Sequence, residues 1–308
     1  MSPSINYANF SEFSDPKNYL PQLPDCQADI AELVKCVQNN LVHPYWLQHY
    51  QLDPDFTQRL DEMQTRSVQQ KLKRLSNNEG PLLADKPANQ RMLGNCRDFA
   101  LLLCTLLRAQ GIAARLRCGF ATYLGMHPYE DHWICEYWHK QQQRWIKVDA
   151  QLDAKQQALL NITFDPLDLP DKQFIYAGSA WQLCRREPER AQQFGILGIT
   201  GWPLLQGNLL RDIFALSKIE LLAWDSGWGL NKHYFEYSQA KQELRLLDKL
   251  AEISAKSLAE QALAQSKGQE LAFPANWQWQ LAPSIADLLQ QHNSAVETDY
   301  TLIDKQHY

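Results

Sequence analysis

The clearest hydrophobic pattern along the chain predicts a helix that begins at Cys96. Apolar residues follow at helical spacing, namely Phe99, Leu102, Leu103 and Leu106. Asn95 suits the N-cap, Asp98 can reach back to it as in a capping box, and Gly111 suits the position just after the helix. Cys96 is therefore expected in the first turn, where unpaired N–H groups and the helix dipole lower the pKa of a thiol. The alternative is a small core residue beside a helix cap.

A second pattern, rich in aromatic and β-branched residues, predicts an antiparallel sheet after this helix. Strand-like segments are IAARLRCGFATYL from residue 112, DHWICEYW from residue 131 and RWIKVD from residue 144. The polar loop HKQQQ lies between the last two segments, so we expect them to form a hairpin. The predicted fold class is α+β, with the cysteine helix packed on an antiparallel sheet and added helices at both ends.

The hairpin brings two ionisable side chains together if its turn is centred at residues 140 and 141. In that register His132 lies opposite Asp149. Glu136 then lies opposite Trp145. Directly opposed residues share a face, with Cβ atoms about 4.5–5.5 Å apart. A slip of one residue would place the histidine and the aspartate on opposite faces. The alternative for the pair is a His–Asp contact without chemistry.

Three further acidic residues surround this pair in the sequence. Asp153 lies four residues past Asp149, but only Asp149 falls opposite His132, so we prefer Asp149 as its partner. Glu130 and Asp131 precede the histidine and are expected to face solvent.

The remaining sequence predicts mostly helices. These are expected at residues 25–40, 54–76 and 236–266, with mixed helix and loop at 154–200. No linker rich in Gly, Ser or Pro divides the chain, so residues 1–308 are expected to form a single domain. Its core is expected at about residues 80–160, with helical additions at 25–76 and 200–290.

Residues 200–230 combine tryptophans with charged residues at helix-like spacing. One interpretation is a wall of a substrate pocket, with Trp202 and Trp224 as apolar sides and Arg211 or Asp212 as polar anchors. Arg211 would suit a substrate carboxylate, because its fork is bidentate and always charged. The alternative is a buried helix with aromatic ends that covers the core.

Composition and charge exclude several classes of partner. The net charge is −5 without a basic patch, so nucleic acid is not an expected partner. No charged-then-apolar leader and no apolar run of about 18 residues is present, which predicts a cytoplasmic protein away from membranes. Seven irregularly spaced cysteines fit a reducing compartment. No C-x-x-C occurs, and His132 and His139 would point to opposite faces of one strand, so neither a metal nor a cofactor is expected.

These motifs together resemble the transglutaminase-like superfamily, which includes transglutaminases, peptide N-glycanases and many bacterial proteins of unassigned activity. The resemblance rests on GNCRDFA, GIAARLRCGF, DHWICEYW and RWIKVDAQLD, and it covers residues 90–153, about a fifth of the chain. It implies a transglutaminase- or papain-like core in which Cys96 is the nucleophile, His132 the base and Asp149 the orienting carboxylate. One departure is that Trp133 follows the histidine directly, where many members place the tryptophan one residue later.

A triad of this kind predicts acyl transfer at an amide bond through a thioester. The expected partner is an amide- or peptide-containing substrate. Water as the acceptor makes the protein an amidase, peptidase or deglycosylase, and an amine makes it a transamidase. The sequence does not choose between these. The alternative is a non-catalytic interaction module of the same fold, a role that many members of this family have, although the presence of all three residues favours an enzyme.

Overall fold

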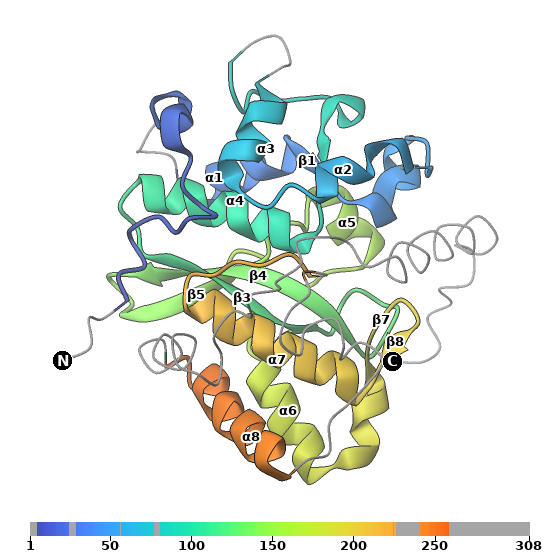
Figure 1. The fold of residues 1–308 in the computed structure, drawn as a ribbon. Coiled ribbons are helices and arrows are strands. Elements are labelled where there is room, and N and C mark those ends of the chain that lie inside the picture. Colours follow the sequence, from blue (N-terminus) through green and yellow to red (C-terminus); the bar gives the residue numbers. More distant parts are fainter. Residues whose placement is uncertain are drawn as a thin grey trace.

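The centre of the fold is a six-stranded sheet with helices on both faces (Figure 1). The computed structural model describes residues 5–24, 29–55, 57–76, 81–223, 225 and 241–258. The strands of the sheet are β3 (Ala114–Ala121), β4 (Tyr129–His139), β5 (Arg144–Val148), β6 (Phe174–Tyr176), β7 (Phe194–Ile196) and β8 (Ile199–Thr200). Their order is β6-β3-β4-β7-β8, and β5 also pairs with β4. The β4–β7 pair is parallel and the other pairs are antiparallel. The predicted α+β class is confirmed.

Helix α4 (Cys96–Ala109) begins and ends where the sequence predicts. The Asn95 side chain accepts a hydrogen bond from the Asp98 N–H at 3.3 Å, and the Asp98 carboxylate accepts one from the Asn95 N–H at 3.1 Å. Gly111 follows the C-cap with φ of 71°, a left-handed conformation that favours glycine. Local sequence therefore determines both ends of this helix.

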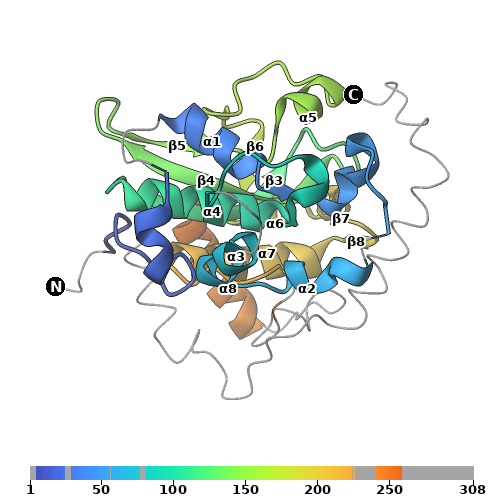
Figure 2. The ribbon, with the colours of Figure 1, turned by 90° about the horizontal axis from the view of Figure 1, so that it is seen from above.

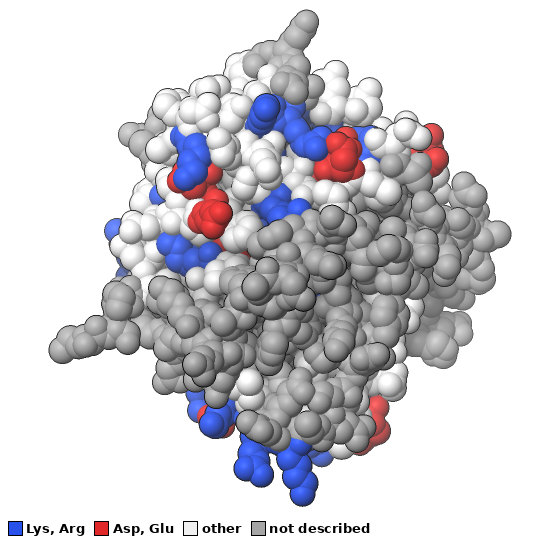
Figure 3. All heavy atoms as spheres, in the orientation of Figure 1, with Lys and Arg blue, Asp and Glu red and all other residues white. Residues whose placement is uncertain are grey.

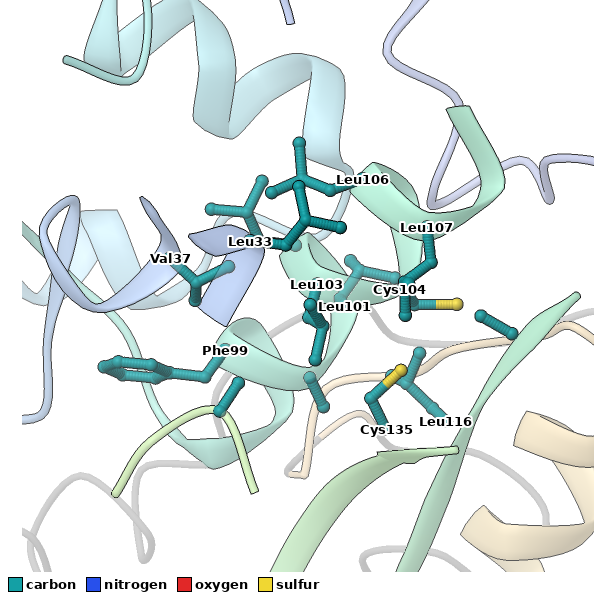
Figure 4. Packing of buried hydrophobic residues seen from close by; sticks show 14 of the residues in the cluster. Leu33, Val37, Phe99, Leu101, Leu103, Cys104, Leu106, Leu107, Leu116 and Cys135 are labelled. Carbon is teal, nitrogen blue, oxygen red and sulfur yellow. The ribbon is translucent and has the colours of Figure 1, made fainter. Parts of the chain in front are cut away.

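A continuous apolar core joins α4 to the sheet and to helix α1 (Ile30–Gln38) (Figure 4). Leu33 and Val37 of α1 belong to this core, and Cys104 of α4 faces Cys135 of β4 inside it. Burying one large apolar side chain stabilises a fold by about 1.5–3 kcal/mol. This packing holds α4 over β4.

The β4–β5 hairpin differs from the predicted register by two residues. Lys147, not Trp145, lies opposite Glu136, and Asp149 follows the last residue of β5. The turn contains four residues and is centred one residue later than predicted. The position of the turn sets the register of a hairpin, so moving its centre by one residue changes every cross-strand pairing by two residues. A shift of two residues keeps each side chain on its predicted face, so His132 and Asp149 still project from the same side.

The single long helix predicted for residues 54–76 is wrong. The structure has a 3₁₀ turn (Thr57–Arg59), a short helix α2 (Leu60–Met63) and helix α3 (Val68–Leu75). The break occurs because Ser67 opens α3 with a capping box that includes Gln70. A capping serine favours a new helix start over continuation of the preceding helix.

The residues after β5 contain more strand than predicted. Strands β6, β7 and β8 are only two or three residues long, too short to show an alternating pattern. The helices of this region are α5 (Ala154–Leu159), α6 (Ala177–Arg186), α7 (Trp202–Leu216) and α8 (Lys241–Ala255). Helices α6, α7 and α8 cover the side of the sheet away from α4 (Figures 1 and 2). Helix α8 falls within the helix predicted for residues 236–266, whose two ends lie outside the described residues.

The surface of the described residues carries charges of both signs. Figure 3, in the orientation of Figure 1, shows Lys and Arg side chains interspersed with Asp and Glu over the upper part of the face that is drawn. Exposed ion pairs such as Arg74–Asp61 at 2.8 Å contribute about 0–1 kcal/mol each. Across the described part of the chain, no helix is long and apolar enough to cross a membrane.

A buried ion network joins the sheet to α7 and α8. Glu136 of β4 lies 2.8 Å from Arg115 and 3.4 Å from Arg117. Arg117 also pairs with Asp212 of α7 at 2.8 Å and donates to the Ser254 carbonyl of α8 at 2.8 Å. Burial would raise the pKa of Glu136, but the two guanidiniums outweigh it and hold the pKa at about 2.

Replacing Glu136 with glutamine is expected to lower the free energy of unfolding at pH 7 by about 3–5 kcal/mol, because it leaves a buried positive charge uncompensated. In the unfolded wild-type protein the Glu136 carboxyl takes up a proton near pH 4.5, and in the folded protein it does so near pH 2. The stabilisation by the charged carboxylate is therefore fully present above pH 4.5 and is lost as the pH falls toward 2. The difference between variant and wild type should therefore shrink by roughly 2 kcal/mol between pH 7 and pH 3.

Urea unfolding at the two pH values measures this difference. Glu252→Gln, which changes an exposed carboxylate on α8, is the control and should stay within about 0.5 kcal/mol of the wild type. A loss that does not change with pH would contradict the assigned ion network.

Candidate active site

Strands β5 and β7 leave a gap along one edge of β4, and the start of α4 reaches into it. β5 pairs with β4 from Cys135 onward, and β7 pairs with only the first two residues of β4. Residues 131–134 therefore have no strand partner on this edge within the described part of the chain. Cys96 lies here, where the backbone N–H of Trp133 acts to lower the pKa of its thiol.

The residues before Cys96 explain its position. Strand β1 (Leu41–Val42) pairs in parallel with β2 (Met92–Leu93), and the Gly94 N–H donates to the Val42 carbonyl at 3.1 Å. A Cβ at Gly94 would lie only 3.1 Å from the Cβ of Asp98, so glycine lets the chain turn closely into the helix cap. The chain is thus held on both sides of the first turn of α4.

His132 and Asp149 form a buried pair beside this first turn. Nε2 of His132 lies 2.8 Å from Oδ2 of Asp149, and each side chain is only 1% exposed. Burial alone would raise the pKa of Asp149, but His132 outweighs it and lowers the pKa. The carboxylate is therefore ionised and can only accept, so Nε2–H is the donor. The Gln151 N–H holds the other carboxylate oxygen at 2.9 Å. Asp153 instead caps α5.

Cys96 and His132 act on each other's pKa. The ring nitrogen that remains available to the thiol is Nδ1, because Nε2 is engaged with Asp149. Burial would lower the pKa of His132, but Asp149 and Cys96 outweigh it and raise the pKa well above its ordinary value. The ring therefore keeps its proton to a higher pH than it would without these two groups. A protonated ring beside the sulfur favours the thiolate relative to a thiol in the same surroundings without one.

The pKa of the Cys96 thiol is shifted in the direction opposite to the prediction. Cys96 is partly exposed, yet burial raises its pKa above the ordinary value, while His132 and the Trp133 N–H act in the lowering direction. The helix start is where the sequence predicts, but desolvation by the packed surroundings is the larger effect. Sequence spacing reports the helix start and does not report how densely the first turn is enclosed.

Two groups at this site could not be predicted from the sequence. Tyr123 lies in the loop between β3 and β4, and its hydroxyl donates to Oδ2 of Asp149 at 2.7 Å. Its ring also packs edge-on against the His132 ring, with centroids 6.0 Å apart. Trp133 contributes a backbone N–H, which no pattern of side chains can reveal.

Where the structure describes them, the side chains predicted to bind substrate lie in the core or, for Trp202, pack against it. Asp212 is fully buried, and its carboxylate accepts hydrogen bonds from Arg117 and two other donors. Arg211 is 1% exposed, and Trp202 packs against another tryptophan ring with centroids 5.4 Å apart. Trp224 lies outside the described residues. These positions favour the interpretation in which this segment covers the core.

Glu130 does not face solvent as predicted. It is 3% exposed because β7 pairs with the start of β4, and its carboxylate accepts from the Met126 N–H at 3.0 Å. Burial raises the pKa of Glu130 to about 7. Asp131 is partly buried and accepts from Asn208 of α7 at 2.7 Å. Both carboxylates flank His132 and interact with its charge.

Comparison with known proteins relates this region to a family. Residues 60–150, which include Cys96, His132 and Asp149, match the family model described as the transglutaminase-like superfamily. Among solved structures, a "Putative Cysteine Protease" from Cytophaga hutchinsonii is 18% identical with a TM-score of 0.29, and the match covers 47% of this chain and 40% of that chain. We draw no conclusion from a structural match of that quality. No curated protein matches the sequence. The family match shows that this chain contains a domain of the transglutaminase-like superfamily at residues 60–150.

Proposed function

We propose that this protein is a thiol-dependent acyl-transfer enzyme that acts on an amide bond. The observation that supports the proposal most directly is the buried His132–Asp149 pair, whose histidine acts on the pKa of Cys96 at the start of a helix. A nucleophile, a base and an orienting carboxylate in such contact recur in thiol enzymes of unrelated folds. Membership of residues 60–150 in the transglutaminase-like superfamily supports the same function.

The acylation step follows from these contacts. His132 takes the thiol proton of Cys96, and the thiolate attacks the carbonyl carbon of the amide. As the new C–S bond forms, the carbonyl oxygen becomes an oxyanion, which backbone N–H groups at the start of α4 stabilise. The C–N bond then breaks, and the imidazolium donates its proton to the leaving amine. Asp149 holds the ring in the required tautomer and stabilises its positive charge.

The second step releases the acyl group. Water or an amine gives a proton to His132 and attacks the thioester carbonyl. The C–S bond breaks, and the Cys96 thiolate recovers the proton from His132. Water makes the protein an amide hydrolase and an amine makes it a transamidase. Assays with and without an added primary amine separate the two, because only a transamidase incorporates the amine into the product.

One observation favours a non-catalytic binding module as the second candidate. His132 and Asp149 are each 1% exposed, and burial raises the pKa of Cys96, as expected for a site closed to substrate. The two candidates differ in the reactivity of the thiol, because a binding module does not need an activated sulfur.

Alkylation by iodoacetamide at pH 7 is expected to modify Cys96 at least about tenfold faster than Cys36. Both thiols are partly exposed, but burial and Asp85 raise the pKa of Cys36 to about 11, and no imidazolium assists it. Since burial also raises the pKa of Cys96, its rate should increase from pH 6 to pH 8 and not already be maximal at pH 6. Peptide mass spectrometry measures both rates in the same sample.

The control for this experiment is His132→Gln, which should bring the rate at Cys96 close to that at Cys36. Equal rates in the wild-type protein, with the fold intact by circular dichroism, would replace the enzyme proposal by the binding module.

A further inference from the structure

Tyr123 contacts both members of the buried pair, and a third side chain fixes its ring. Its hydroxyl donates to Asp149, and its ring lies edge-on to His132, as described above. The Tyr123 ring also packs against the ring of Phe164, with centroids 5.2 Å apart. Tyr123 thus belongs to a small apolar cluster with Ile134 and Phe174, on the face of the sheet from which His132 projects. Its hydroxyl is therefore held in one place.

The hydroxyl and the histidine use the same oxygen. Oδ2 of Asp149 accepts from Tyr123 at 2.7 Å and from His132 Nε2 at 2.8 Å, whereas Oδ1 accepts from the Gln151 N–H at 2.9 Å. Two donors on one carboxylate oxygen share its negative charge, so each bond is weaker than it would be alone. The position of Asp149 does not depend on Tyr123 alone, because the Gln151 N–H and His132 also hold the carboxylate.

We propose that Tyr123 is a positioning residue that sets how strongly Asp149 holds the proton on His132. The inference rests on the proposed function, since it concerns the proton that His132 must give to the leaving amine. By taking part of the charge on Oδ2, the hydroxyl keeps the imidazolium acidic enough to act as the general acid. Without it, Asp149 would bind the imidazolium more tightly and slow the proton transfer.

Other charges act on His132 and must stay unchanged in any test. Cys96 approaches from α4, Asp149 from the end of β5, and Glu130 and Asp131 lie beside it on β4. Glu130 also accepts from the Met126 N–H in the loop that carries Tyr123. A substitution at Tyr123 should therefore remove only the hydroxyl and keep the ring, so that the loop and these carboxylates stay in place.

The test is Tyr123→Phe, with two measurements. The titration midpoint of His132, followed by NMR on histidine-labelled protein and assigned by its absence from His132→Gln, should move upward by about half a pH unit. Amide cleavage should show a kcat about three- to tenfold lower with KM unchanged, because proton donation becomes harder while binding is the same. Alkylation of Cys96 at pH 7 should not slow, since the imidazolium beside the sulfur is stabilised.

Tyr50→Phe is the matched control, because Tyr50 also donates its hydroxyl to an aspartate, Asp153, which does not contact His132. It should leave the His132 midpoint where it is. If Tyr123 only packs the site, Tyr123→Phe will leave the His132 midpoint unchanged, or will lower it because Asp149 is held less firmly. Either result overturns the inference. The midpoint needs no substrate, so a wild-type protein without amide-cleaving activity would refute the proposed function and leave the role of Tyr123 to be decided by the titration.

Discussion

Cys96→Ala is expected to lower the rate of amide cleavage or amide exchange by at least about a thousandfold, because the proposed acylation has no other nucleophile. Among the described cysteines, only Cys96 combines a helix start with a histidine that acts on its pKa. Most of the other described cysteines are buried, and Cys36 is partly exposed and donates to the Leu83 carbonyl at 3.7 Å. Release of the leaving amine from peptide amide substrates measures the rate.

The control is Cys36→Ala, which removes a thiol of similar exposure on α1 and should keep activity within about twofold of the wild type. Both variants should unfold at nearly the wild-type temperature, which shows that any loss arises from the chemistry. Substantial turnover by Cys96→Ala would refute the thioester mechanism.

Asp149→Asn is expected to lower the rate by about a hundredfold or more, but by less than Cys96→Ala, because the orienting group sets the tautomer while the nucleophile forms the bond. The asparagine amide also removes the charge that raises the pKa of His132, so that pKa should fall. The ring then loses its proton at lower pH, and alkylation of Cys96 at pH 7 should slow. The pH profiles of alkylation and of turnover measure both effects.

Asp153→Asn is the matched control for this variant. Asp153 lies four residues further along the chain, caps α5 through the Gln156 N–H at 2.9 Å and accepts from Tyr50. Its replacement should cost at most about 1 kcal/mol of stability through the weakened cap and should leave the His132 titration unchanged. An Asp149→Asn protein with the same His132 midpoint as the wild type would show that the pair is structural.

The start of the cysteine helix and the face of the histidine strand could be predicted because both depend on short-range rules. The Asn95–Asp98 capping box and Gly111 act within α4 and its two ends, and they appear in the structure as predicted. His132 and Asp149 were placed on one side of the hairpin by the two-residue period of a strand. That period explains why their contact survives a register error of two residues.

The exact hairpin register could not be predicted, because it depends on where the turn is centred within the polar loop. Strands of two or three residues, such as β7 and β8, were missed because they are too short to show a period. These elements nevertheless shape the site, since the gap beside β4 exists only because β5 ends before β7 begins to pair.

The sequence by itself determined the helix that presents Cys96, the α+β class and the common face of His132 and Asp149, because capping and periodicity are properties of neighbouring residues. Only the tertiary structure decided the direction of the Cys96 pKa shift, the burial of Glu130 and Asp212, and the contact of Tyr123 with Asp149. Each of these depends on desolvation or on a hydrogen bond between segments distant along the chain. Such effects arise from how densely the elements pack, and no local pattern of residues records that density.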